Sequence, residues 1–238
     1  MERLIAGAAA LGTDLSPDQV AQFELYRDEL LAWNRTMNLT AITDREEVAT
    51  KLFLDSLTVF LALPQGLTPA TRLVDVGTGA GFPGIPLKIV CPDLPLTLVE
   101  ATRKKARFLE HLVERLELSR VQIIVARAED AAHLPEHREA YQVVTARALA
   151  RLPIAVELTV PFCAIGGVVV ISVKGDFGPD VERASGAVER LGGHIRECTP
   201  VTVPWLDDGR ALVIIDKLSP SPEAFPRRAG MPAKRPLA

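Results

Sequence analysis

The sequence predicts an α/β protein in which a doubly wound, mostly parallel sheet ends in an antiparallel hairpin and follows a small helical subdomain. Beyond residue 70, short β-branched apolar runs alternate with helix-like stretches, which is typical of strands buried on both faces of a parallel sheet. The first 64 residues contain no strand-like run. The last two strand-like runs are joined by a segment containing Asp207-Asp208-Gly209, a turn signal that predicts a hairpin.

The N-terminal subdomain is expected to contain three helices. The first begins at Ser16, where S-P-D-Q forms a capping box with proline at the first helical position, and runs to about Trp33. A second capping box, formed by Thr43 and Glu46, predicts another helix. Asp55-Ser56 predicts the start of a third helix, which runs to Leu63 before Pro64.

The α/β part follows the linker P-Q-G-L-T-P. The expected strands are 72–76, 96–99, 121–125, 141–145, 168–173, 195–203 and 210–217. The expected helices between them are 86–90, 103–118, 152–163 and 179–191. We therefore divide the chain into a helical subdomain (1–64), an α/β domain (70–218) and a basic, proline-rich tail (219–238).

The composition is that of a globular protein, with 48% hydrophobic and 24% charged residues among 238 and a formal net charge of −3. A nucleic acid would therefore have to be held by local basic patches. Cys91, Cys163 and Cys198 lie far apart and form no metal-ligand or disulfide pattern. Pro135 between His133 and His137 argues against a helical metal pair, so we expect no metal.

No apolar stretch approaches the length of a membrane span. The apolar run 4–11 is short, has one basic residue before it and leads into a helix start, which favours a cytoplasmic protein over a secreted one. We expect a monomer that does not contact membranes.

Residues 75–84, D-V-G-T-G-A-G-F-P-G, form a glycine loop directly after an expected strand. Read from Gly79, the loop is the dinucleotide fingerprint G-x-G-x-x-G. Read from Asp75, it is D-x-G-x-G-x-G, the S-adenosylmethionine (SAM) loop of methyltransferases. Gly77, Gly79 and Gly81 let the turn adopt positive φ and approach a ligand closely. The closing hairpin is the outline of the class I SAM-dependent methyltransferase fold, which is Rossmann-like, and it favours SAM without settling the choice.

The ends of the next strands carry polar groups suited to an adenosine. Glu100 ends the second strand, where an acid can accept hydrogen bonds from both ribose hydroxyls. The alternative for Glu100 is an N-cap-like anion before the next helix, but the glycine loop upstream favours the ligand contact. Ala128 and Glu129 follow the third strand, where a backbone N–H and a side-chain acceptor can read an adenine edge, although an exposed loop is equally compatible with this pattern.

Two cations follow the later strands. Arg147, after the fourth strand, suits an anionic substrate whose ring nitrogen attacks a methyl group without deprotonation, so that catalysis is mainly positioning. The alternative for Arg147 is a surface salt bridge. Lys174, after the fifth strand, adds a cation to the same rim.

Two further basic clusters each allow two interpretations. Arg103, Lys104 and Lys105 begin a helix, where they either contact phosphate or form a solvated face with Glu110 and Glu114. The tail has Arg227 and Arg228 and no acid after Glu223, and its composition alone favours a solvated segment.

Eight segments resemble one known family, the bacterial small-subunit ribosomal RNA methyltransferase G family, also called glucose-inhibited division protein B. They span almost the whole chain, and G-F-P-G-I-P-L is far more specific than the glycines alone. The segments are W-N-R-T-M-N-L-T-A-I from Trp33, F-L-D-S-L from Phe53, L-V-D-V-G-T-G-A-G-F-P-G-I-P-L from Leu73, L-V-E-A-T-R-K-K-A-R-F-L from Leu98, R-A-E from Arg127, V-T-A-R-A-L-A from Val144, the stretch 166–175, and F-P-R-R-A-G-M-P-A-K-R-P-L from Phe225.

The resemblance implies SAM-dependent methylation of the ring nitrogen at position 7 of one guanine in 16S rRNA, free or in the small ribosomal subunit. It places cofactor contacts at Gly77, Phe82, Glu100, Ala101, Thr102, Ala128, Glu129 and Arg147, to which the loop pattern adds Asp75, Gly79 and Gly81. The residue patterns and the resemblance together predict catalytic positions at Arg147, Lys174 and Asn38, of which the resemblance contributes Asn38. They also predict RNA contacts at Arg103, Lys104 and Lys105, from their charge, and at Arg227 and Arg228, to which the resemblance adds weight.

The chain departs from the family at Leu52, where members commonly have a histidine three residues before the aspartate of D-S. A general-base role for that position is therefore doubtful, and a lone-pair nitrogen can react without one. The competing interpretations are a SAM enzyme acting on another RNA or a small molecule, and an NAD-dependent oxidoreductase.

Overall fold

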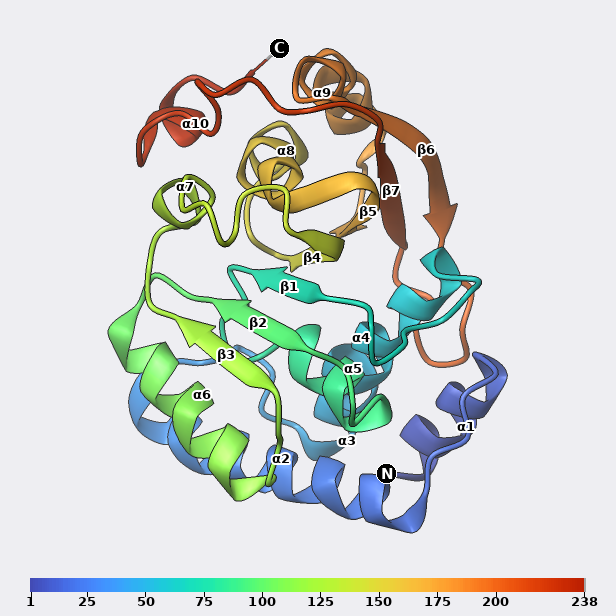
Figure 1. Cartoon of the computed structure of the whole chain (residues 1–238). Coiled ribbons are helices and arrows are strands. Elements are labelled where there is room, and N and C mark those ends of the chain that lie inside the picture. The colour runs from blue at the N-terminus through green and yellow to red at the C-terminus, as the bar shows by residue number, and fades with distance from the viewer. Residues whose placement is uncertain (238) are drawn as a thin grey trace.

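A single seven-stranded sheet forms the centre of the molecule in a computed structural model, which describes residues 1–237 (Figure 1). The strand order is β3-β2-β1-β4-β5-β7-β6, and β7 alone runs opposite to the other six strands. The strands are β1 Leu73–Val76, β2 Leu96–Val99, β3 Val121–Ile124, β4 Tyr141–Arg147, β5 Cys163–Lys174, β6 Gly193–Pro200 and β7 Arg210–Lys217. The predicted parallel sheet with a closing antiparallel hairpin is confirmed.

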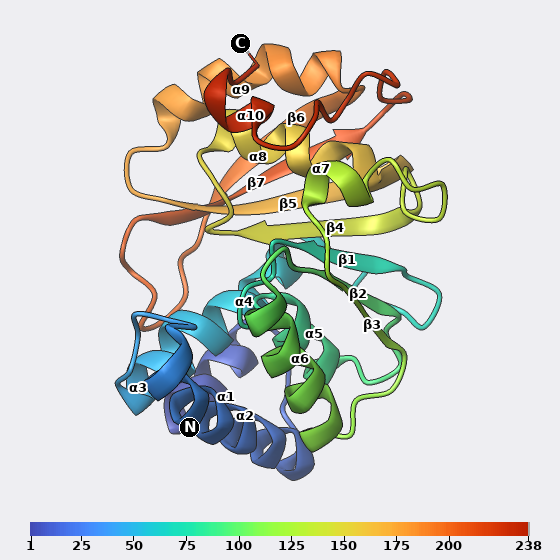
Figure 2. The same ribbon diagram turned by 90° about the vertical axis from the view of Figure 1, so that its left-hand side faces the viewer.

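Helices cover both faces of the sheet, and the N-terminal helices add a further layer on one side (Figure 2). The α-helices of the α/β part are α5 Gly84–Val90, α6 Arg103–Arg115, α7 Ala128–Ala131, α8 Leu152–Thr159, α9 Gly178–Arg190 and α10 Met231–Lys234. The N-terminal elements are α1 Glu2–Ala10, α2 Pro17–Met37, α3 Arg45–Glu47, η1 Val48–Leu54, α4 Asp55–Leu57 and η2 Thr58–Ala62, and η3 Val160–Phe162 follows α8.

Alternating strand residues build two separate hydrophobic cores. Leu73 faces the core shared with α5, α6 and the N-terminal helices, whereas its neighbour Val74 faces the core under α8 and α9. The same alternation continues across the sheet, as in Ile214 and Ile215 of β7. The N-terminal helices therefore share a core with one face of the sheet, and their packing helps to position the loops at its edge.

The capping box at Ser16 is confirmed: Ser16 Oγ accepts from Gln19 N at 3.2 Å, and Gln19 Oε1 accepts from Ser16 N at 2.9 Å. The second capping box is wrong by one residue, because Asp44 is the cap and accepts from the N–H groups of Glu46 and Glu47. The third helix has no separate start. Residues 45–62 form one continuous helical segment that changes between α, π and 3₁₀ geometry.

The tail folds back onto the α/β domain, a finding that composition alone did not favour. Ser221, Phe225 and Leu237 are buried, and Arg138 of the body donates to the carbonyl oxygens of Ser221, Pro222 and Phe225. Because these contacts are made mainly by backbone groups of the tail, its polar and proline-rich side chains do not reveal them.

None of the helices in the described part of the chain is long and apolar enough to cross a membrane. Within residues 1–237, no group of three or more His, Cys, Asp or Glu side chains is arranged to hold a metal ion.

Candidate active site

The glycine loop leaves β1 and turns into α5 with three glycines in the left-handed region of φ. Gly77 has φ +68°, and the side chain of Leu149 lies where a Cβ at Gly77 would be. Gly81 has φ +102°, and a Cβ there would lie 2.8 Å from Tyr26 Oη. At both positions the positive φ favours glycine, and at Gly81 the fully buried Tyr26 also leaves no room for a Cβ.

Asp75 fixes the conformation of this loop through hydrogen bonds of its side chain. Its carboxylate is completely buried and accepts hydrogen bonds from Thr78 Oγ1 at 2.6 Å, Gly84 N at 3.0 Å and Thr145 Oγ1 at 3.1 Å. Burial raises the pKa of Asp75 to about 6, although these hydrogen bonds and Arg147 oppose the increase. The residue predicted to contact a cofactor is thus used within the protein to shape the loop.

A cavity of about 360 Å³ lies over the carboxyl ends of β1, β2 and β3. Of the predicted cofactor residues, Gly77, Glu100, Ala101, Ala128 and Glu129 line it. Gly79, Gly81, Phe82 and Thr102 are not among its lining residues, and Thr102 N donates to Glu100 Oε1 at 2.7 Å. The position of the cavity matches the crevice where open α/β sheets bind ligands.

Glu100 connects this cavity to the glycine loop. Its Oε2 accepts from Gly79 N at 3.0 Å, and the side chain is almost fully buried. Each carboxylate oxygen has two lone pairs, so one acceptor site per oxygen is left for a ligand after the bonds to Gly79 and Thr102. Glu100 therefore both fixes the loop and presents acceptors to the cavity.

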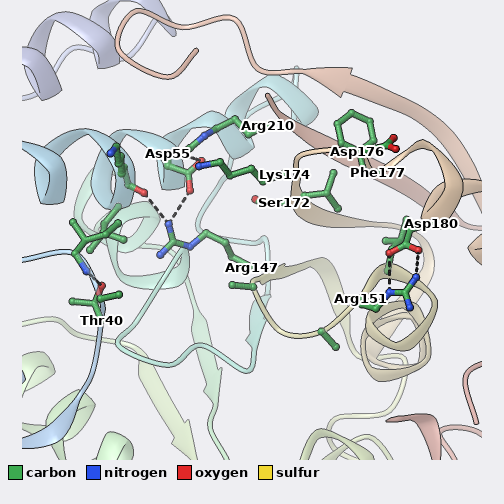
Figure 3. Close-up of a pocket in the computed structure, with 18 of the residues that line it drawn as sticks. Thr40, Asp55, Arg147, Arg151, Ser172, Lys174, Asp176, Phe177, Asp180 and Arg210 are labelled. Carbon is green, nitrogen blue, oxygen red and sulfur yellow. Dashed lines mark hydrogen bonds and ion pairs between the residues drawn. The ribbon is translucent and has the colours of Figure 1, made fainter. Parts of the chain in front are cut away.

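A second cavity, of about 630 Å³, lies on the other side of the segment that follows β4 (Figure 3). Ala148 and Ala150 line both cavities, so that the two meet at this segment. Five basic side chains and three acidic ones line the second cavity: Lys51, Arg147, Arg151, Lys174, Arg210, Asp55, Asp176 and Asp180. The excess of basic groups suits an anionic ligand.

A chain of ion pairs crosses the second cavity from the N-terminal helices to β7 (Figure 3). Arg147 Nη1 donates to Asp55 Oδ2 at 2.8 Å, and Arg210 pairs with the other oxygen of Asp55. Arg210 also donates to Asp208, whose Oδ2 accepts from Lys174 Nζ at 2.7 Å. The Arg210 hydrogen bonds, with help from Lys174, hold the pKa of Asp208 well below its usual range.

Arg147 is therefore held in place on several sides. Its Nη1 also donates to Lys51 O at 3.1 Å, and its guanidinium lies 4.9 Å from the centre of the Phe82 ring. Phe82 in turn stacks on Tyr26, whose hydroxyl donates to Ala80 O at 2.5 Å. The salt-bridge alternative for Arg147 holds geometrically, but the bridge is largely buried at a cavity wall and does not lie on the open surface.

The remaining predicted residues lie around the two cavities. Asn38 is exposed and ends α2 in the left-handed conformation that asparagine tolerates, one residue before the lining residue Leu39. Leu52, at the family's histidine position, lines the second cavity. Lys174 lines it as well, with its side chain 60% exposed.

The basic residues predicted to contact RNA differ in their environments. Arg103 and Lys104 are exposed at the start of α6, whereas Lys105 lines the first cavity. Arg228 is exposed, but Arg227 pairs with the fully buried Glu157. Within residues 1–237, no ion pair joins Arg103, Lys104 or Lys105 to Glu110 or Glu114.

Sequence reasoning missed several residues that build the site. The sequence patterns place Asp55 at a helix start, Tyr26 within the first expected helix and Arg210 in a strand, and they give none of the three a role in the site. Asp55 lies in the F-L-D-S-L segment that resembles the family, and this segment is the sequence signal for its role. The contacts of these residues join segments 54 to 155 residues apart, so local patterns could not reveal them.

Comparison with known proteins agrees with this geometry. Residues 19–185 match the family model of rRNA small subunit methyltransferase G. The chain is 49% identical over 237 residues to the ribosomal RNA small subunit methyltransferase G of Dehalococcoides mccartyi and 48% identical to that of Roseiflexus castenholzii, with 100% of each chain covered in both cases.

Solved structures agree at the level of the fold. An rRNA methylase from Streptococcus thermophilus superposes with a TM-score of 0.51 at 13% identity, covering 68% of this chain and 95% of that one. Aeropyrum pernix fibrillarin, solved with S-adenosyl-L-methionine bound, has a TM-score of 0.50 at 19% identity, covering 66% of this chain and 74% of that one. The fold is that of class I methyltransferases, and the chain belongs to the rRNA small subunit methyltransferase G family.

Proposed function

We propose that this protein transfers the methyl group of SAM to the position 7 ring nitrogen of a guanine in 16S rRNA, as a cytoplasmic enzyme. The observation that carries the proposal is the meeting of two unlike cavities at residues 148–150. One has the glycines and acids suited to an adenosine ligand, and the other has the basic groups suited to RNA. The names of the relatives support the same substrate class.

The residues of the first cavity fit SAM. Gly77 gives the close approach, Glu100 presents carboxylate acceptors for ribose hydroxyls, and Ala128 and Glu129 supply polar groups at the far end. When bound, SAM supplies an electrophilic methyl group on a sulfonium. Leu149, which packs on Gly77 and lines the first cavity, stands between this cavity and the second one.

The second cavity supports binding and orientation of the nucleotide. Arg147, Lys174 and Arg210 offer N–H donors to guanine O6 or to phosphate oxygens. The guanine N7 lone pair is free at neutral pH, so the protein has no proton to remove from it. The absence of a histidine at Leu52 is compatible with this chemistry, and rate enhancement comes from positioning.

The test is methyl transfer from labelled SAM to naked 16S rRNA and to small ribosomal subunits, followed by nucleoside analysis. The proposal expects label in 7-methylguanosine with at least one of the two substrates. Transfer only to small molecules, or tight NAD binding without SAM binding, would contradict it.

A further inference from the structure

The C-terminal tail reaches the cofactor cavity. Gly230, Pro232 and Ala233 line this cavity together with Ile154 and Leu158 of α8. Gly230 N donates to Glu129 Oε1 at 2.9 Å, so the tail is hydrogen-bonded to a residue at the end of the cavity next to β3. Figure 2 shows α10 lying against the same side of the sheet as α7 and α8.

This end of the cavity has the chemistry that an adenine ring requires. Ile154, Leu158, Pro232 and Ala233 give an apolar surface from two elements, while Ala128 and Glu129 give polar groups at its edge. A flat heteroaromatic ring binds best where apolar groups cover its faces and a few polar groups meet its edge. Without the tail, one of the two apolar walls would be missing.

One buried ion pair holds the tail in place. The Glu157 side chain is fully buried in α8, and it accepts from Arg227 N at 2.8 Å, Nε at 2.9 Å and Nη2 at 2.6 Å. The same Nη2 donates to Arg235 O at 2.6 Å, which joins the two ends of the segment that contains α10. A bidentate arginine–carboxylate pair fixes orientation as well as position.

We propose that residues 230–233 form the outer wall of the adenine end of the SAM site, and that the Arg227–Glu157 pair is the clamp that positions this wall. The inference rests on the proposed function, because it assumes that the cavity binds SAM. It gives Arg227 a positioning role toward the cofactor, in place of the RNA contact that its sequence suggests. SAM and the docked tail then stabilise each other.

Binding of SAM is measured by calorimetry on the full-length protein without RNA, with two matched pairs of variants. Arg227→Ala is expected to weaken binding at least about tenfold, whereas Arg228→Ala, which changes an exposed neighbour, leaves it within about twofold. Ala233→Glu introduces a charge into the apolar wall. We expect it to weaken SAM binding about as much as Arg227→Ala does. Ala229→Glu places the same charge on an exposed residue that does not line the cavity, and binding stays near wild type.

Thermal unfolding of each variant without SAM distinguishes loss of the wall from loss of the fold. Because Ala233 is exposed, we expect its replacement to leave the unfolding temperature close to that of the wild type. Hydrogen exchange gives an independent measure: SAM is expected to slow exchange of the amides of residues 229–235 in the wild type. If the wild type binds no SAM, the proposed function and this inference both fail. If the wild type binds SAM and Ala233→Glu binds it equally well, or the tail amides are not protected, only this inference is overturned.

Discussion

Glu100 has two roles in the proposed site. It accepts a hydrogen bond from the backbone of the glycine loop, and it lines the cofactor cavity. Glu100→Ala removes the acceptors for the ribose and leaves Gly79 N without its partner. We expect SAM affinity to fall by about 1–3 kcal/mol, which is about five- to 150-fold. Calorimetry checks this value, with Glu110→Ala, an exposed residue of α6, as the control. Unchanged affinity in Glu100→Ala would mean that the ribose lies elsewhere.

Arg147 lies at the boundary between the cofactor loop and the second cavity, over the Phe82 ring. In Arg147→Ala, Asp55 keeps its ion pair with Arg210, so the fold is expected to stay intact. Turnover on rRNA should fall on the order of 100-fold, because the group that orients the reacting nucleotide is gone.

Circular dichroism and single-turnover kinetics check both parts of the Arg147 prediction. Arg196→Ala, which breaks an exposed pair with Asp216, serves as the control. If Arg147→Ala turned over rRNA at the wild-type rate, the ion pair between Arg147 and Asp55 would have only a structural role.

Asp75 is expected to make stability depend on pH. Its pKa is about 6 in the folded protein and 3.8 in the unfolded chain, so the folded state keeps the proton to a higher pH. The stabilisation is complete below about pH 4 and is lost as the pH rises to about 6. Relative to Asp75→Asn, the wild type should lose up to about 3 kcal/mol of unfolding free energy across this window. Urea unfolding of both proteins from pH 4 to 7 measures this difference, and a constant difference would contradict the assignment.

At the scale of elements, helix α2 supports the glycine loop through Tyr26. Tyr26 is fully buried, its hydroxyl donates to Ala80 O, and its ring stacks on the ring of Phe82. Burial raises the pKa of this tyrosine well above its ordinary value, so it remains a neutral donor across the physiological range.

Tyr26→Phe keeps the ring and leaves a buried carbonyl unpaired, at a cost of about 1–3 kcal/mol in unfolding free energy. The glycine loop should also become less ordered, which weakens SAM binding by a few-fold. Thermal unfolding with and without SAM measures both effects. A variant as stable as the wild type would show that α2 does not hold the loop.

At the scale of the whole molecule, the sequence predicted the features that depend on residues close together along the chain. The alternation of strands and helices, the closing hairpin and the glycine loop all follow from spacing that is visible along the chain. Helix ends were less certain, because Asp44 and Thr43 are both good N-caps and only the backbone geometry selects between them.

The candidate site was predicted in part. The residues at strand ends, such as Gly77 and Glu100, line the cavity because parallel strands bring their carboxyl ends to one edge. The network through Asp55 and the clamp between Arg227 and Glu157 were not predictable, since each joins segments at least 70 residues apart. From charge alone, Arg227 and Arg228 are expected to have the same role. In the structure, Arg227 pairs with the buried Glu157, whereas Arg228 is exposed.

The two cavities that meet at residues 148–150 are expected to bind SAM and a guanine of small-subunit rRNA side by side, so that the guanine is methylated. The most direct measurement is the modified-nucleoside profile of 16S rRNA from cells with and without this protein. We expect that one 7-methylguanosine disappears when the protein is absent and returns when the wild type, but not Arg147→Ala, is restored. An unchanged 7-methylguanosine content in cells that lack the protein would contradict it.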